Sequence, residues 1–166
     1  MIRIAINGYG RIGRIAHRVI LERHPHEVDV VAINTSSSTD IKGWMYLLKY
    51  DTAYGPLDRN LKTQNVNLKY KDQIGWFVVD GTEIPVFSQK DPSLLPWKDL
   101  SVDVVIESTG VFRKEKQLKT HLDAGAKAVI LSAPTKGDPS ASSGQDIPTY
   151  IISVNEKDYK GEKIIS

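Results

Sequence analysis

Three glycines fall within six residues near the start of the chain, at Gly8, Gly10 and Gly13 in the stretch INGYGRIGR. Glycine loses more conformational entropy on folding than any other residue, so a cluster of three needs a physical reason. In a dinucleotide-binding turn the first glycine permits a tight bend, the second lets a pyrophosphate approach the backbone, and the third lets a helix pack on a strand. The alternative is that the glycines serve only a turn and close packing.

The segments on either side of these glycines favour the first interpretation. Residues 2–6 form an apolar, β-branched run typical of a buried strand, and apolar positions recur at helical spacing from Arg11 until His24-Pro25. A second buried strand is expected at Val28–Asn34. Strand, glycine turn, helix and strand make one βαβ unit of parallel sheet. In that context the free N–H groups and positive dipole end of the helix face the phosphates of a dinucleotide.

The whole chain predicts a Rossmann-type α/β fold, a doubly wound and mostly parallel sheet within one domain of residues 1–166. A small antiparallel excursion is expected at about 65–87, with Asp80-Gly81 as its hairpin turn. The other expected elements are a helix from Thr39 or Asp40 to about Tyr50, a strand at 102–107, a helix at 114–124, a strand at 128–132, a loop rich in Pro, Gly and Ser at 134–148, a strand at 150–154 and the beginning of a strand in the terminal EKIIS.

The end of the second strand bears on the choice of cofactor. Dinucleotide sites usually place an acidic residue about 20 residues after the glycines, where it binds the hydroxyls of the adenosine ribose. This chain has Asn34-Thr35-Ser36-Ser37-Ser38 there instead. Hydroxyls and backbone N–H groups tolerate a 2′-phosphate, which a carboxylate repels. The sequence therefore favours NADP, and the alternative is that the serines form only a capped turn and NAD is bound.

Composition limits the other functional classes. The net charge of +2 is too small to indicate nucleic acid or an anionic membrane surface as a partner. The chain has no cysteine, which excludes disulfides, thiolate metal sites and a cysteine nucleophile within these residues. No apolar run is long enough for a membrane span and the N-terminus lacks the pattern of a signal peptide, so a cytoplasmic location is expected.

Longer segments resemble one known family. The segments INGYGRIGR, LLKYDTAYG, PWKDLSVDVVIESTGVF, AGAKAVILSAPTKGD and SVNEKDY occur in order along the chain. Together they resemble the N-terminal, nucleotide-binding part of phosphorylating glyceraldehyde-3-phosphate dehydrogenase. The chain departs from the family's pattern at Thr35, where the family usually has Asp, and at Ser153-Val154-Asn155, where it usually has Gly-Val-Asn.

The resemblance implies a set of cofactor contacts. The glycine turn and the helix start would hold the pyrophosphate, the end of the second strand the adenosine ribose, and a lysine the adenine or a 2′-phosphate. Residues after the strand at 102–107 would border the cofactor across the sheet, and a serine would lie near the nicotinamide. In that order the residues are Gly8, Gly10, Arg11, Ile12 and Gly13; Asn34 and Thr35; Lys90; Ser108, Thr109, Gly110 and Phe112; and Ser132. From the residues alone, Lys90 can equally be a solvated charge and Phe112 part of the core.

The resemblance also implies the chemistry of the parent enzyme. The family oxidises glyceraldehyde 3-phosphate to 1,3-bisphosphoglycerate by thiolate attack, hydride transfer to NAD or NADP, and phosphorolysis of the thioester. Its cysteine and the histidine that activates it lie beyond the position of Ser166. This chain is therefore expected to bind cofactor without catalysing, and to contain no catalytic residue and no metal site. Its four histidines are expected to be solvated or packed, and the partner of Glu107, at the end of a buried strand, stays open.

Partners and alternatives follow from the same resemblance. The full enzyme is expected to use glyceraldehyde 3-phosphate and phosphate and to form a homotetramer, with no nucleic acid or membrane partner. One alternative is the equivalent domain of an erythrose-4-phosphate dehydrogenase. Another is a stand-alone dinucleotide-binding module without catalysis.

Overall fold

The computed structural model describes residues 1–136 and 147–166. In chain order the elements are β1 Ile2–Asn7, α1 Arg11–Arg23, β2 Val28–Asn34, α2 Ile41–Lys49, β3 Tyr50–Asp51, β4 Gly55–Pro56, β5 Leu61–Gln64, β6 Gln73–Val79, β7 Thr82–Phe87, the 3-10 helix η1 Pro92–Leu94, β8 Val104–Glu107, α3 Glu115–Asp123, β9 Ala128–Leu131, the 3-10 helix η2 Glu156–Asp158 and β10 Ile164–Ile165.

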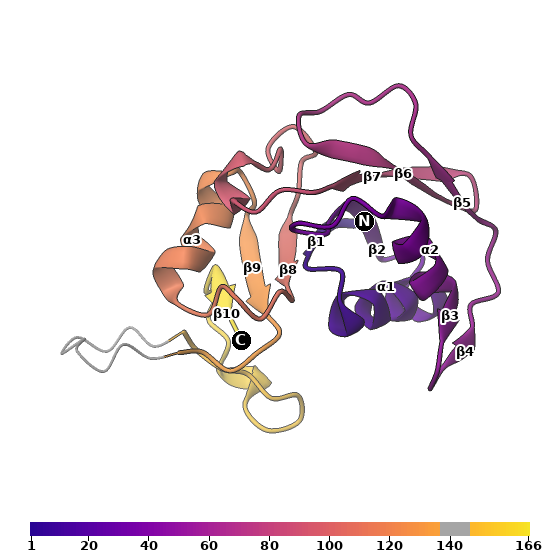
Figure 1. Cartoon of the computed structure of the whole chain (residues 1–166). Helices are drawn as coiled ribbons and strands as arrows, with labels where there is room; N and C mark the ends of the chain where they lie inside the picture. The colour runs from indigo at the N-terminus through magenta and orange to yellow at the C-terminus, as the bar shows by residue number, and fades with distance from the viewer. Residues whose placement is uncertain (137–146) are drawn as a thin grey trace.

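Most strands join one sheet in the order β10-β9-β8-β1-β2-β7-β6-β5 (Figure 1). The pairings from β10 to β7 are parallel, and β6 and β5 are added in antiparallel fashion. Strand β1 lies between β2 and β8. The chain therefore adds β2 on one side of β1 and later adds β8 on the other side. This is the strand order of a doubly wound Rossmann-type fold, and the predicted fold class is confirmed.

The two faces of the sheet are buried in separate cores. Along β1, Ile4 and Ile6 belong to one core, and Ala5 between them belongs to the other. This alternation follows from the period of two in a strand, which directs successive side chains to opposite faces. The sheet is therefore covered on both sides, as parallel sheets require.

Different helices cover the two faces. Ile20 of α1 and Leu48 of α2 pack in the core with Ile4 and Ile6, whereas Leu118 of α3 packs in the core with Ala5. Figure 1 shows α1 and α2 together on one side of the molecule and α3 on the other. Each crossover helix lies next to the strands that it connects, which places the starts of α1 and of the β8–α3 loop at the same edge of the sheet.

The antiparallel excursion differs in detail from its prediction. Its outer strand is β5 at 61–64, which lies before the predicted range of about 65–87. Leu61 pairs with Val79, so the apolar side of β5 is placed on the core, whereas Val66 and Leu68 are exposed. The hairpin turn is confirmed, because Asp80 and Gly81 join β6 and β7.

A strand predicted at 150–154 is not formed. Residues 152–154 belong to a turn, and Ile151, Ile152 and Val154 are exposed. A β-branched run becomes a strand only where a neighbour pairs with it, and here the edge position of the sheet is taken by β10 within the terminal EKIIS. The loop predicted at 134–148 lies mostly outside the described residues. Within the described part of the chain, every helix is too short or too polar to cross a membrane.

Candidate functional site: the carboxyl edge of the central strands

The glycine turn between β1 and α1 is held tightly by its neighbours. The N–H of Gly8 donates to the carbonyl of Asn34 at 2.9 Å, and Gly8 has φ +95°. A Cβ at Gly8 would lie 2.5 Å from the backbone nitrogen of Thr109, and one at Gly13 would lie 2.3 Å from the Gly8 oxygen. Gly8 and Gly13 therefore serve the packing of the turn against β2, the β8 loop and the helix.

The start of α1 is open by comparison. Gly10 is the N-cap residue; no side chain caps the helix and its first turn contains no acidic residue. Arg11 and Ile12 are exposed, and among the described residues nothing lies within 4 Å of a Cβ placed on Gly10. The backbone of Gly10 has φ −69°, a value that any residue adopts. The chain itself thus gives no reason for glycine here, whereas an anion on the free N–H groups does.

The loop after β8 meets this turn across the sheet. The Ser108 hydroxyl donates to the Gly8 carbonyl at 2.6 Å, and the Ser108 N–H donates to the Asn7 carbonyl at 2.8 Å. Gly110 is exposed with φ +72°, a conformation that favours glycine. Because β1 lies between β2 and β8, this edge is the topological switch point of the sheet, the position at which open α/β sheets bind their ligands. This position, between the ends of β2 and β8, is called the crevice.

The end of β2 is fixed by side chains that turn inward. Asn34 is buried, and its Oδ1 accepts from the N–H of Gln89 at 2.9 Å while its Nδ2 donates to the Gln89 carbonyl at 2.8 Å. The Thr35 hydroxyl lies 2.5 Å from the carbonyl oxygen of Ser38 and 3.0 Å from that of Phe87, and it has one proton to donate to them. Thr35 is only 7% exposed. Its hydroxyl is therefore occupied by the protein's own backbone.

Three other predicted residues lie around these elements in different surroundings. Lys90 is exposed, directly after the Gln89 that is clamped to Asn34. Phe112 is half-buried against the core on the α3 side. Ser132 is exposed, and its N–H donates to the Glu107 carbonyl at 3.0 Å. Ser132 thus joins the edge formed by β1, β2 and β8, Lys90 lies beside the β2 end, and Phe112 is largely a packing residue.

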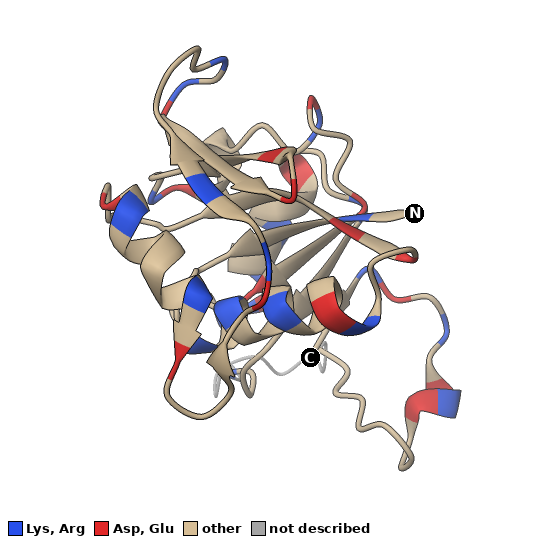
Figure 2. Ribbon diagram, turned by 90° about the vertical axis from the view of Figure 1, so that its right-hand side faces the viewer, with Lys and Arg blue, Asp and Glu red and all other residues tan. Residues whose placement is uncertain are grey.

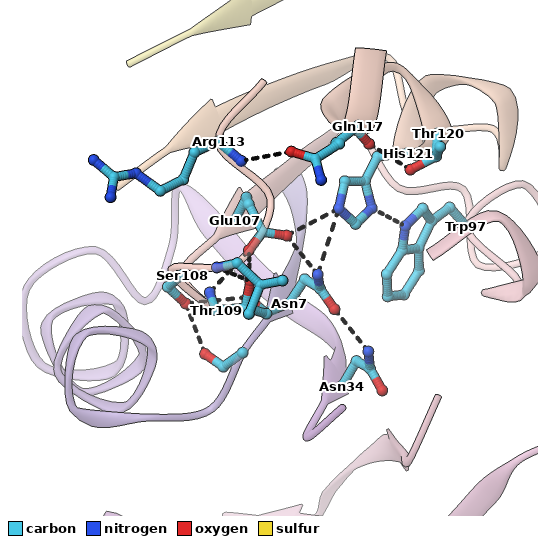
Figure 3. A network of polar contacts seen from close by, with 12 residues as sticks. Asn7, Asn34, Trp97, Glu107, Ser108, Thr109, Arg113, Gln117, Thr120 and His121 are labelled. Atoms are coloured by element: carbon cyan, nitrogen blue, oxygen red, sulfur yellow. Dashed lines mark hydrogen bonds and ion pairs between the residues drawn. The ribbon is translucent and has the colours of Figure 1, made fainter. Parts of the chain in front are cut away.

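The structure reveals a buried polar network that the sequence did not predict (Figure 3). Glu107 and His121 are fully buried, and His121 Nε2 lies 3.0 Å from Glu107 Oε2. Asn7 donates to the same carboxylate oxygen, and Trp97 donates to the other nitrogen of His121. Polar residues at the ends of apolar strands were the available signal for Asn7 and Glu107. The sequence held no equivalent signal for His121, which comes from α3.

A second buried pair joins the glycine turn to the body of α1. The Tyr9 hydroxyl lies 2.6 Å from Nδ1 of His17, and both side chains are buried. Burial lowers the pKa of His17 to about 3, so the ring is neutral near pH 7. Burial likewise raises the pKa of the Tyr9 hydroxyl well above its usual value.

One basic side chain near the start of α1 is paired with an acid. Arg11 pairs with Asp51 at 3.4 Å. Backbone N–H groups of Ala53 and Tyr54 lower the pKa of the Asp51 carboxyl. Figure 2 shows Lys and Arg interleaved with Asp and Glu along the ribbon. The free backbone N–H groups at the start of α1 add to the positive charges of Arg11 and Arg14 there.

Comparison with known proteins shows the family to which the chain belongs. Residues 2–115 match the family described as glyceraldehyde 3-phosphate dehydrogenase, NAD binding domain. The chain belongs to this family. It is therefore a nicotinamide-dinucleotide-binding domain, and the resemblance seen in its motifs is confirmed.

Whole relatives extend the match over the entire chain. A glyceraldehyde-3-phosphate dehydrogenase of Thermotoga maritima is 47% identical over 99% of the chain, and one of Clostridium acetobutylicum is 42% identical over 100%. A relative in Trypanosoma brucei brucei, named as cytosolic, is 37% identical over 100%. The chain spans 44% of the length of each of these relatives.

Proposed function

We propose that the chain binds the dinucleotide with its pyrophosphate on the start of α1. The observation that carries this proposal is Gly10, an exposed N-cap with open space around it and no side-chain cap on its helix. The N–H groups of Arg11, Ile12 and Gly13 then donate to phosphate oxygens, and the helix dipole adds to their attraction. A side chain at residue 10 would fill the space that the pyrophosphate needs.

The remaining predicted residues take places along the crevice. Asn34 and Thr35 lie at the adenosine ribose, and Lys90 extends beside them toward the adenine or a 2′-phosphate. Ser108, Thr109 and Gly110 border the cofactor on the other side of β1, with Phe112 behind them. Ser132 lies on the nicotinamide side.

The end of β2 supports NADP as the favoured cofactor, with NAD as the alternative. It carries no carboxylate, and the Thr35 hydroxyl is occupied by the carbonyls of Ser38 and Phe87. Recognition of a 2′-phosphate therefore falls to the exposed Ser37, the backbone of the Ser36–Ser38 turn and the Lys90 ammonium. Thr35 contributes by not repelling the phosphate.

The parent enzyme is proposed to be a phosphorylating glyceraldehyde-3-phosphate dehydrogenase. It would convert glyceraldehyde 3-phosphate and phosphate to 1,3-bisphosphoglycerate with reduction of NAD or NADP, as a homotetramer in the cytoplasm. Such chemistry needs a thiol nucleophile, and these 166 residues contain no cysteine. The chain by itself is therefore expected to bind the dinucleotide without turning over substrate.

Calorimetric titration of the chain with NAD⁺ and with NADP⁺, at one salt concentration, tests the proposal. We expect both to bind, with NADP⁺ the tighter. Thr35→Asp and, separately, Ser37→Asp should weaken NADP⁺ binding by about tenfold or more, because a carboxylate there repels the 2′-phosphate. Thr35→Asp should also reverse the order of the two cofactors.

Thr82→Asp is the matched control, because it adds the same charge to an exposed position at the start of β7. The other end of that strand, at Phe87, is the end that contacts Thr35. It should leave both affinities within about twofold. Binding of neither cofactor would contradict the proposed site. Tighter NAD⁺ binding by the unchanged chain would contradict only the cofactor preference.

A further inference from the structure

Five side chains form a continuous, buried network of hydrogen bonds beneath the crevice (Figure 3). They come from three strand ends, a loop and a helix, and they run in the order Asn34, Asn7, Glu107, His121, Trp97. Each is almost completely buried, so solvent cannot supply a missing partner. Each hydrogen bond in this network must therefore have a defined donor and a defined acceptor.

The direction is fixed at one end by a backbone N–H. Gln89 N–H can only donate, and it donates to Asn34 Oδ1 at 2.9 Å. The Asn34 amide is thereby oriented, and its Nδ2 donates to Asn7 Oδ1 at 2.7 Å. Asn7 in turn must present its Nδ2, which donates to Glu107 Oε2 at 2.5 Å.

The direction is fixed at the other end by an indole. Trp97 Nε1–H can only donate, and it donates to His121 Nδ1 at 3.0 Å. The proton of the imidazole is consequently on Nε2, which donates to Glu107 Oε2 at 3.0 Å. His121 Nε2 and Asn7 Nδ2 lie 3.4 Å apart because both approach this one oxygen.

The second carboxylate oxygen is occupied from the crevice side. Glu107 Oε1 accepts from the N–H of Thr109 at 2.8 Å and from the Thr109 hydroxyl. Glu107 thus accepts four hydrogen bonds, and three of the four donors are N–H groups that cannot accept one in return. A carboxylate satisfies all four, whereas an amide would direct a hydrogen at an N–H group on whichever side its nitrogen faces.

We propose that Glu107 is the positioning residue of the dinucleotide crevice, the one acceptor on which donors from its two sides converge. Through Thr109 it sets the loop Ser108–Gly110, and through Asn7 it sets Asn34 at the ribose side. The inference rests on the proposed binding function and goes beyond it, because Glu107 and His121 lie beneath the crevice and act through other residues. A buried carboxylate with a neutral histidine beneath it is the specific arrangement to be tested.

Glu107→Gln is the decisive variant, with Glu83→Gln, an exposed position on β7, as its matched control. The new amide would direct a hydrogen at the N–H groups of Asn7 and His121 or, with its nitrogen turned the other way, at the N–H of Thr109. We expect NAD⁺ and NADP⁺ affinities to fall by about tenfold or more in protein that circular dichroism shows to be folded, and by less than about twofold in the control.

Adding Trp97→Phe distinguishes positioning from loss of packing. Without the indole donor the imidazole proton can move to Nδ1, and Nε2 can then accept from the new amide. The double variant should therefore recover part of the lost affinity, although it has lost one more hydrogen bond. A merely structural role predicts the opposite, because each truncation would add to the damage.

Nitrogen NMR of the unchanged chain tests the same hydrogen-bond directions without any substitution. The His121 ring should carry its proton on Nε2 alone, with and without cofactor, and the histidine signals can be assigned by a His121→Asn variant. A proton on Nδ1, or on both nitrogens, would overturn the inference.

The proposed function and the positioning role of Glu107 can fail separately. If the unchanged chain binds neither dinucleotide, the proposed function fails and Glu107 has no crevice to position. If the unchanged chain binds and folded Glu107→Gln binds equally well, or the double variant is no better than the single one, the positioning role fails while the proposed function stands.

Discussion

The starts of α1 and α2 solve the same physical problem in opposite ways. Every helix begins with N–H groups that have no partner within the helix. At α2 the Asp40 carboxylate accepts from the N–H of Gly43 at 2.9 Å, whereas α1 begins at Gly10 without a side-chain cap. The protein thus caps the start of α2 with its own carboxylate. It leaves bare the start of α1, where we propose that the dinucleotide binds.

Gly10→Ala should have the largest effect among the variants that test this difference between the two helix starts. The methyl group enters the open space at the start of α1, so the affinity for NAD⁺ or NADP⁺ should fall by about tenfold or more. The free energy of unfolding without cofactor should change by less than about 1 kcal/mol, since the backbone of Gly10 is unstrained. Calorimetry and urea denaturation measure the two effects.

Gly8→Ala is the contrasting variant within the same turn. Its φ of +95° and the Thr109 backbone at 2.5 Å predict lost stability rather than selective loss of affinity. Equal behaviour of the two variants would contradict the distinction between a packing glycine and a ligand-facing glycine.

A change of pH tests the other polar contact of α1. This contact is the buried pair of Tyr9 and His17, in which His17 lies in the body of the helix and not at its start. The folded pKa of His17 is about 3, below its ordinary value of 6.5, so the unfolded chain binds a proton more readily. The stabilising contribution is complete above pH 6.5 and is lost as the pH falls toward 3. Between pH 7.5 and 5 we expect a loss of about 2 kcal/mol in urea denaturation.

His17→Gln should flatten that pH dependence, because it removes the titrating ring. His26→Gln, at an exposed position, is the control and should leave the slope nearly unchanged. A slope that persists in the His17 variant would assign it to other groups.

Asp40→Ala has the smallest expected effect. It removes the cap of α2, and the free energy of unfolding should fall by about 1 kcal/mol. Cofactor affinity should stay within about twofold, because the N–H groups of α2 serve the fold. A loss of affinity like that of Gly10→Ala would mean that the start of α2 also faces the ligand.

Local patterns predicted the elements whose partners are local. The helix predicted from Arg11 to His24 is α1 at 11–23, and the buried run at Val28–Asn34 is β2. Both are specified by periodicity and by turn residues close in sequence. The outer strand β5 and the residues at 150–154 were misplaced, because only pairing with distant strands determines which apolar run joins the sheet.

The site shows the same limit. Spacing alone predicted the glycine turn, since a βαβ unit brings its parts together within one crossover. His121 could not be predicted as the partner of Glu107, because the ring reaches the carboxylate only after α3 packs on the sheet. The inward hydroxyl of Thr35 likewise depends on Phe87, 52 residues further along the chain.

The central place of β1 has a consequence for synthesis. Its two neighbours are β2, which follows within a few tens of residues, and β8, where Ile4 pairs with Val104. At about 5–20 residues per second, the ribosome needs several seconds or more to produce the second neighbour after the first. During that interval one apolar edge of β1 has no partner strand, and such an edge is a template for unwanted pairing. A nascent chain of this protein therefore exposes this edge of β1 from completion of β2 until β8 is made.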